Sequence, residues 1–267
     1  MTTSSDSPEP ATRSHQATSS QEFDRLFAHE QADNAFSQLV HRVDPQLPTG
    51  LGPFSFLSTS LLHHISEQLH LQDGQMLADL GCGPGGPGLW LAGQAHAAVT
   101  GIDFSAVAIT AARHRAEHLS VPAVFSVADL ASLPLPDESV DRAVSLDALQ
   151  YAPDRTTAVR EARRILRPGG RLVLTGWQPR IPGDERLPAR HRHTDWHSVL
   201  SAAGFTDIGT ADDPAWDTAY QEIYRQAITV PSERGTALAG LQGEARRRLP
   251  TAHLLRRIAV TAVRPAG

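Results

Sequence analysis

The stretch from Leu77 to Gly88, LADLGCGPGGPG, decides the fold of this chain. It opens with apolar residues, and a short apolar run bounded by turn residues is typical of a buried strand. Five glycines follow between positions 81 and 88, so the backbone there can adopt positive φ angles and approach a ligand closely. Pro87 suits the first turn of a helix. Strand, glycine loop and helix in this order predict the start of a nucleotide-binding α/β domain.

Strand and helix patterns alternate on both sides of the loop. Strands are predicted at residues 76–80, 97–102, 121–127, 140–146, 171–177, 205–210 and 256–263. Ser105 and Asp154 stand where helix N-caps belong, and residues 166–170 read as a turn. The predicted fold class is therefore α/β: a Rossmann-like, doubly wound, mainly parallel seven-stranded sheet. It has an N-terminal helical lid and a helical insertion before the last strand.

Three segments are expected in the domain organisation. Residues 1–20 are rich in Ser, Thr, Pro and Ala and predict a disordered tail. Residues 21–70 carry apolar side chains at helical spacing and predict an N-terminal helical cap. This cap either closes partly over the ligand site, which we favour, or only covers the edge of the sheet. Residues 71–267 form the ligand-binding domain, with the helical insertion at 215–248.

Composition excludes several classes of protein. The net charge of −5 gives no basic surface for nucleic acid, and no apolar run approaches the roughly 20 residues that span a bilayer. A single cysteine leaves no intramolecular disulfide. We expect a cytoplasmic protein, monomeric or homodimeric, with a small-molecule substrate and no nucleic-acid or membrane partner. The histidines lack the spacing of a metal site.

Carboxylates recur near the ends of the predicted strands: Asp79, Asp103, Asp129 and Asp147. The carboxyl edge of such a sheet is where ligands bind. Asp103 lies 22 positions beyond Gly81, which also suits a nicotinamide dinucleotide. Pro84 and Pro87, however, remove backbone donors that a pyrophosphate would use, and Asp79 adds negative charge. These features favour S-adenosylmethionine, which has a sulfonium and an ammonium group and no phosphate.

Five short motifs, in order along residues 55–265, resemble class I S-adenosylmethionine-dependent methyltransferases. The resemblance is nearest to their ubiquinone/menaquinone-type branch, many of whose members act on small molecules in bacterial specialised metabolism. The motifs are 79–85 (DLGCGPG), 101–105 (GIDFS), 128–141 (ADLASLPLPDESVD), 166–172 (LRPGGRL) and 202–205 (AAGF).

This resemblance implies roles for particular residues. Gly81, Gly83 and Gly85 would line the methionine part of the cofactor, and Asp79 would place its ammonium group. Asp103 would hold the two ribose hydroxyls. The remaining implied contacts are Phe104 and Leu130 beside the adenine, Asp129 at its amino group, and the backbone of Leu146 at the methionine part. Cys82 reads as a small loop residue rather than a nucleophile.

The acceptor side is less determined. Asp147 is the candidate catalytic base or hydrogen-bond acceptor, and a cap for the following turn is an equal alternative. Gln150, Tyr151 and Trp177 are expected to shape the substrate pocket. His191 and His193 lie among arginines and read mainly as part of a solvated basic loop. Aromatic residues of the two helical regions should wall the pocket: Phe54, Phe56, Trp216 and Tyr220.

The resulting prediction is transfer of a methyl group from S-adenosylmethionine to a small acceptor, apolar or aromatic, through oxygen, nitrogen or carbon. Sequence alone leaves open a cyclase or isomerase that keeps the cofactor without methylating. A nicotinamide-dependent oxidoreductase is less well supported, because no proton-relay group or substrate domain is evident. A purely binding module is the least favoured alternative.

Overall fold

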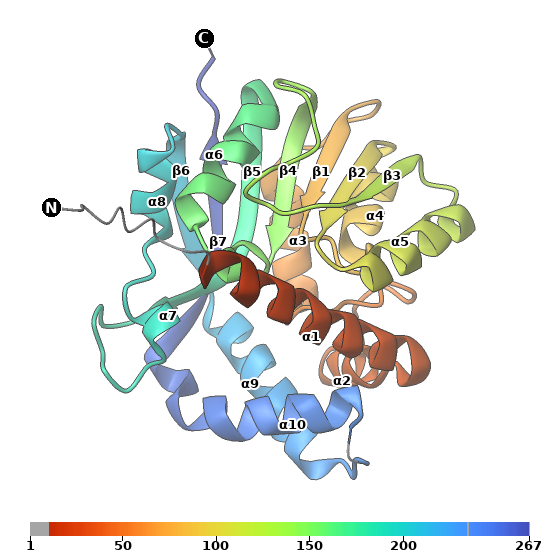
Figure 1. Ribbon diagram of the computed structural model, residues 1–267, viewed down its shortest axis with the longest axis vertical. Helices are drawn as coiled ribbons and strands as arrows, with labels where there is room; N and C mark the ends of the chain where they lie inside the picture. Colours follow the sequence, from red (N-terminus) through yellow and green to blue (C-terminus); the bar gives the residue numbers. More distant parts are fainter. Residues whose placement is uncertain (1–10, 234, 267) are drawn as a thin grey trace, which may run out of the picture.

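The computed structural model describes residues 11–233 and 235–266, with side chains from Ser20 onward, and contains one seven-stranded sheet (Figure 1). The strands are β1 (Met76–Leu80), β2 (Ala98–Asp103), β3 (Ala123–Val127), β4 (Val140–Leu146), β5 (Leu166–Pro179), β6 (Thr206–Asp212) and β7 (Leu255–Val263). Their order is β3-β2-β1-β4-β5-β7-β6. Strands β1 to β5 pair in parallel, while β7 runs antiparallel to both β5 and β6. The predicted fold class is confirmed.

Ten α-helices and two 3₁₀ segments are assigned within the described residues. They are α1 (Ala11–Asp33), α2 (Ala35–Val43), α3 (Thr59–Leu69), α4 (Gly86–Ala95), α5 (Ala106–Leu119), η1 (Leu149–Tyr151), α6 (Arg155–Ile165), α7 (Ala189–Arg192), α8 (Trp196–Ala202), α9 (Pro214–Thr229), α10 (Ala237–Arg248) and η2 (Leu249–Leu254). Both predicted N-caps form. The Ser105 hydroxyl accepts from the Ala108 amide, and the Asp154 carboxylate accepts from two amides at the start of α6.

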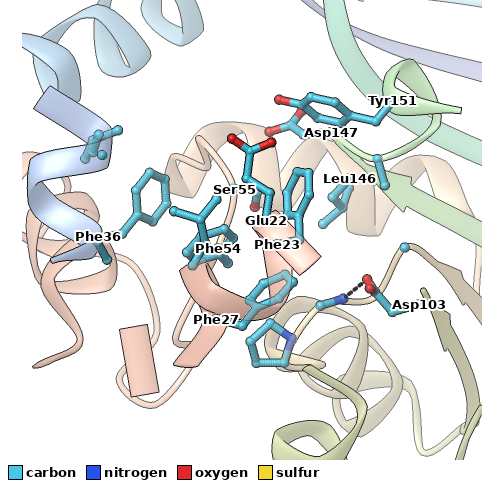
Figure 2. A pocket seen from close by; sticks show the side chains of 18 of the residues that line it. Glu22, Phe23, Phe27, Phe36, Phe54, Ser55, Asp103, Leu146, Asp147 and Tyr151 are labelled. Carbon is cyan, nitrogen blue, oxygen red and sulfur yellow. Dashed lines mark hydrogen bonds between the residues drawn. The ribbon is translucent and has the colours of Figure 1, made fainter. Parts of the chain in front are cut away.

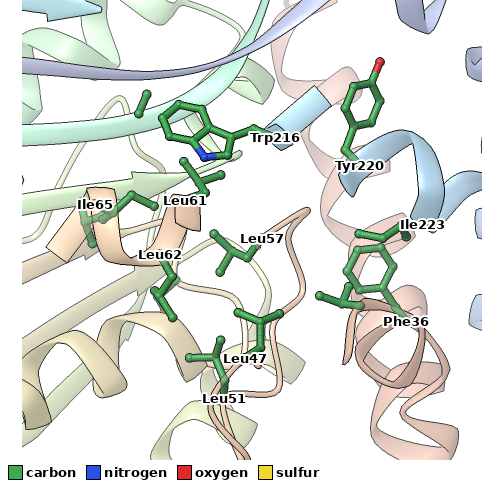
Figure 3. Close-up of a cluster of buried hydrophobic side chains, with 14 of the residues drawn as sticks. Phe36, Leu47, Leu51, Leu57, Leu61, Leu62, Ile65, Trp216, Tyr220 and Ile223 are labelled. Atoms are coloured by element: carbon green, nitrogen blue, oxygen red, sulfur yellow. The ribbon is translucent and has the colours of Figure 1, made fainter. Parts of the chain in front are cut away.

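Each face of the sheet has its own hydrophobic core. Alternate residues of a strand point to opposite faces, so Leu77 joins one core while Ala78 and Leu80 join the other. The first core also contains α3, α4, α5 and the α9–α10 insertion. Figure 3 shows leucines of α3 packed beneath Trp216 of α9. The second core is formed with α6 and α8. Helices on both faces leave the carboxyl edge of the sheet as the place for a site.

Helix α1 lies across that carboxyl edge, with α9 and α10 beyond it (Figure 1). It is tied to α5 by a hydrogen bond from the Ser105 hydroxyl to Asp24 and by another from the Gln31 amide to the Val107 carbonyl. Residues 11–20, which the sequence predicts to lie in a disordered tail, belong to helix α1 (Ala11–Asp33). The first ten residues of that predicted tail lie outside the described residues.

Strand β5 begins at Leu166, earlier than the sequence predicts. Leu166 pairs with Val140 of β4, and the register then shifts before Arg142 pairs with Arg171. The predicted turn at 166–170 is therefore an irregularity inside the strand, with Gly169 at φ +75°.

Candidate functional site

A cavity of about 810 Å³ opens at the carboxyl ends of β1, β2 and β4 (Figure 2). The glycine loop and strand ends form one side of its wall. The other side comes from α1, the segment around Phe54–Phe56, η1 and α10. Two sets of residues from distant parts of the chain therefore meet around one space.

The glycine loop is shaped by close contacts and not only by flexibility. Gly81 has φ +77°, and a Cβ on it would lie 2.2 Å from the Cβ of Ala148. The loop backbone also bonds to the next strand, because the Gly81 and Cys82 amides donate to the Ile102 carbonyl at 2.7 and 3.0 Å. The loop is thereby held against the end of β2, where Asp103 lies.

Asp79 and Asp103 form an acidic pair beside this loop, each 4% exposed. Asp103 accepts hydrogen bonds from the amides of Gly83 and Ser105, both at 2.9 Å. Among the described residues, no cationic side chain forms an ion pair with either carboxylate. Burial and the neighbouring charge of Asp103 raise the pKa of Asp79 to about 7, and burial also raises the pKa of Asp103. Such a pair favours a ligand that brings positive charge and hydroxyl donors.

Gly88 supports this pair, although its place in the sequence suggests only a role in helix–sheet packing. A Cβ at Gly88 would lie 2.1 Å from Oδ2 of Asp79, so the helix start must carry glycine for the carboxylate to fit. The sequence shows that Gly88 follows Asp79 by nine positions, but it does not show that the two residues are in contact.

Most of the predicted cofactor residues line the cavity: Asp79, Gly81, Gly83, Asp103, Phe104, Asp129, Leu130 and Leu146. Gly85 is the exception and does not line it. Its amide donates to the Cys82 carbonyl, and a Cβ there would face Ala112 and Leu89. It is buried as the N-cap of α4 because the loop turns inward at that point. Cys82 is buried too, and burial raises the pKa of its thiol well above the ordinary value, which agrees with an unreactive loop residue.

Asp147 lies in the cavity wall but is already fully engaged. Arg257, which is completely buried, binds both carboxylate oxygens, and Thr175 and the Phe56 amide donate to one oxygen each. A carboxylate has about four lone-pair sites, and four donors occupy them here. The surroundings therefore favour a positioning role, joining the segment before α3 to β5 and β7, over that of a base.

The acceptor side of the cavity is mainly aromatic. Phe23 and Phe27 of α1 contact each other, and Phe23 also meets Phe104 and Tyr151 edge to face. Phe54 and Phe56 extend this wall, together with Phe36 from α2 and Leu241 from α10. The predicted substrate residues Gln150, Tyr151 and Trp177 all line the same cavity. The cavity thus combines an acidic end and an apolar aromatic end.

Some predicted wall residues lie elsewhere. Trp216 does not line the main cavity: its indole donates to the Ser60 hydroxyl at 3.1 Å within the core. Tyr220 lines only a smaller side cavity of about 30 Å³ behind Phe56 and Trp177. Both side chains turn inward because their face of α9 packs on the core below it.

His191 is buried, so the prediction that it lies in a solvated basic loop is wrong, whereas His193 is exposed as predicted. His191 is 3% exposed, and its Nε2 meets Arg190 Nε at 3.1 Å and Arg248 Nη1 at 2.9 Å. Burial and the nearby arginines lower the pKa of His191 to about 4, so the ring is neutral near pH 7. The described part of the chain has no group of three or more His, Cys, Asp or Glu side chains arranged to hold a metal ion. None of its helices is long and apolar enough to cross a membrane.

Comparisons with known proteins agree with this geometry. Residues 78–174 match the family model described as a methyltransferase domain. Methyltransferase GfsG of Streptomyces halstedii is 34% identical over 149 residues, which are 55% of this chain and 54% of that protein. The 27-O-demethylrifamycin SV methyltransferase of Amycolatopsis mediterranei is 40% identical over 119 residues, 44% of each chain. The chain spans about half the length of these two relatives.

Solved structures show the same fold over more of the chain. The [4+2]-cyclase SpnF is 28% identical, with a TM-score of 0.66 over 78% of this chain and 81% of that one. The phosphoethanolamine N-methyltransferase 2 of Haemonchus contortus, in complex with S-adenosylhomocysteine, has a TM-score of 0.66. It is 19% identical and covers 86% of this chain and 60% of that one, so it bears on the fold alone.

Proposed function

We propose that this chain, whose residues 78–174 match the model of a methyltransferase domain, is a class I S-adenosylmethionine-dependent methyltransferase that methylates a small acceptor of apolar or aromatic character. The observation that carries the proposal is the continuity of the cavity. It runs from two buried carboxylates beside a glycine loop to an aromatic wall under α1 and α10.

The residues at the acidic end fit the cofactor. Asp79, buried without a cationic partner among the described residues, would pair with the ammonium group, and Asp103 has remaining lone pairs for the ribose hydroxyls. Phe104, Asp129 and Leu130 would surround the adenine. S-adenosylmethionine supplies a methyl carbon that its sulfonium already activates. The protein therefore has to align the acceptor and exclude water, and alignment can lower a barrier by roughly 7–11 kcal/mol.

Helix α1 and the aromatic wall would perform both tasks. Phe23 contacts Phe104 on the cofactor side and Tyr151 on the acceptor side, so one side chain of α1 bridges the two ends of the cavity. This arrangement supports the partial-lid interpretation of the N-terminal helices. Gln150 and Tyr151 of η1 and Trp177 of β5 would contact the acceptor.

The test combines binding with product analysis. Calorimetry should show that S-adenosylhomocysteine binds while NADH does not. With S-adenosylmethionine and a panel of hydroxylated aromatics, mass spectrometry should show a product in which one methyl group replaces a hydrogen, a net gain of CH2, and an equal amount of S-adenosylhomocysteine. Absence of cofactor binding would overturn the proposal.

A second function deserves the same assay, because the cyclase SpnF shares 28% identity over most of both chains. A non-methylating cyclase or isomerase would bind the cofactor but release a product of the same mass as its substrate, without forming S-adenosylhomocysteine.

A further inference from the structure

Helix α10 brings into the cavity a carboxylate that none of the sequence motifs contains. Glu244 lines both the main cavity and the small side cavity behind Phe56 and Trp177. Its side chain is 32% exposed, so a ligand in the cavity can reach it. Arg248, one turn later on α10, donates through Nε to Oε1 at 3.0 Å, and the Tyr224 hydroxyl of α9 is also hydrogen-bonded to it. Glu244 is thus oriented by two neighbours while part of it stays open.

The charged and titratable groups around Glu244 come from several elements. Arg190 of α7 and Arg247 of α10 lower its pKa through their charges, as does the Tyr224 hydrogen bond. Burial outweighs them, and the pKa of Glu244 is raised above its ordinary value. Tyr151 of η1 lies nearby and interacts electrostatically with Glu244. A carboxylate in such surroundings is a better proton acceptor than one in water.

The other candidates for proton transfer at this end of the cavity are less suitable. Both oxygens of Asp147 are saturated by Arg257, Thr175 and the Phe56 amide. His191 has its Nε2 engaged by two arginines. Burial raises the pKa of Tyr224 well above its ordinary value, so its hydroxyl keeps its proton. Glu22 of α1 also lines the cavity, but it is exposed to solvent.

We propose that Glu244 is the general base of the reaction and that the acceptor atom is the oxygen of a hydroxyl group. The inference rests on the proposed methyltransferase function. In the step, the acceptor oxygen forms a bond to the methyl carbon while the carbon–sulfur bond breaks, and that electron pair goes to sulfur. The hydroxyl proton passes to a carboxylate oxygen of Glu244 and afterwards to solvent. Tyr224 and Arg248 act as positioning residues for the carboxylate.

Binding tests the hydroxyl contact without requiring turnover. In the complex with S-adenosylhomocysteine, 2-naphthol offers a hydroxyl donor and 2-methoxynaphthalene does not. Glu244→Met removes the acceptor oxygens at similar length, so the affinity for 2-naphthol should fall about tenfold while that for the ether stays within about twofold. Equal losses for both probes, or no binding of 2-naphthol to the wild-type complex, would overturn the inference.

Kinetics with 2-naphthol and S-adenosylmethionine test the base itself. Glu244→Gln keeps the shape but should lower kcat about 10²- to 10⁴-fold and remove the acidic limb of the pH–rate profile. Tyr224→Phe should lower kcat less than Glu244→Gln does and should move that limb to higher pH, because a hydrogen bond that lowers the pKa of Glu244 is lost. Glu222→Gln is the matched control, since it breaks an ion pair with Arg225 on the surface of the same insertion.

The outcomes separate the two proposals. If S-adenosylhomocysteine does not bind, the proposed function fails, and this inference fails with it. If the wild type methylates 2-naphthol and Glu244→Gln does so at an unchanged rate with an unchanged pH profile, only the role of Glu244 is wrong.

Discussion

The carboxylates at the two ends of the cavity differ in whether a cationic side chain of the protein pairs with them. At the glycine-loop end, Asp79 and Asp103 are buried with no ion-pair partner within the described residues. At the apolar aromatic end, here called the acceptor end, Asp147 is paired with Arg257 and Glu244 is paired with Arg248. The first end keeps an unbalanced negative charge that a cationic ligand can neutralise. The second is balanced by the protein itself, so it can accommodate an apolar molecule. Binding selectivity and structural stability should therefore respond to different carboxylates.

Asp103→Ala should give the largest effect on ligand binding. Each hydrogen bond to a charged group contributes about 1.5–3 kcal/mol, so losing two to the ribose should weaken S-adenosylhomocysteine binding about 10²- to 10⁴-fold in calorimetry. Asp141→Asn is the control, because Asp141 pairs with Arg167 at the opposite end of the sheet. A loss of only a few-fold at Asp103 would contradict the assigned contact.

Arg257→Met should act on stability instead. It leaves the Asp147 carboxylate buried without its cation, and such a change costs about 3–5 kcal/mol in the free energy of unfolding, measured with urea. Arg256→Met is a neighbouring control: its ion pair with Asp212 is largely exposed and should be worth less than about 1 kcal/mol. Similar losses in the two variants would mean that the buried pair is not a special feature of the acceptor end.

Gly88→Ala should disturb the acidic end without touching a charge. The new Cβ would lie 2.1 Å from Oδ2 of Asp79, so the carboxylate has to move. Overpacking of this kind costs about 1–3 kcal/mol, and we expect a loss of this size in the binding of S-adenosylhomocysteine. Gly93→Ala in the same helix serves as control, because its Cβ would meet only Val121 at 3.6 Å. Unchanged binding in Gly88→Ala would show that the position of Asp79 is not critical.

The pH dependence of Asp79 should give the smallest effect. Its pKa of about 7 lies above the ordinary 3.8, so the unliganded fold binds a proton and loses stability from this group as pH rises between these values. An ammonium ligand needs the ionised carboxylate. Affinity for S-adenosylhomocysteine should therefore rise by up to about tenfold per pH unit toward pH 7 and then level off. Calorimetry between pH 5.5 and 7.5 measures this slope, and a slope that persists in Asp79→Asn would assign it to another group.

The acidic end was largely predictable because its parts are local in sequence. The loop at 81–88 follows directly on β1, and each parallel strand delivers its last residues to the same edge of the sheet. Asp79 and Asp103 could therefore be expected at the same edge from the pattern of strands. Gly85 was expected to line the cofactor site and Gly88 was not. In the structure Gly88 lies against Asp79, whereas Gly85 faces Ala112. The direction in which a glycine faces depends on how α4 packs against β1, which the sequence does not show.

The acceptor end was predictable only in character. Gln150, Tyr151 and Trp177 were anticipated from their places after β4 and in β5, and the aromatic content of the flanking helices indicated an apolar wall. The sequence did not indicate that hydrogen bonds would occupy both oxygens of Asp147, because Arg257 is 110 positions away in the chain. Glu244 lies in a helix without a recognisable motif, and the sequence contains no signal that it faces the cavity.

Sequence by itself determined the alternating α/β pattern, the glycine loop and the carboxylates at the strand ends, since these depend on backbone conformation and on residues close in the chain. The tertiary structure decided which carboxylates stay unpaired and which are neutralised. That outcome depends on Arg257 from β7 and on α1, α9 and α10, brought together by the burial of their apolar faces. Charge balance in a cavity is a property of neighbours in space, and a single sequence does not specify those neighbours.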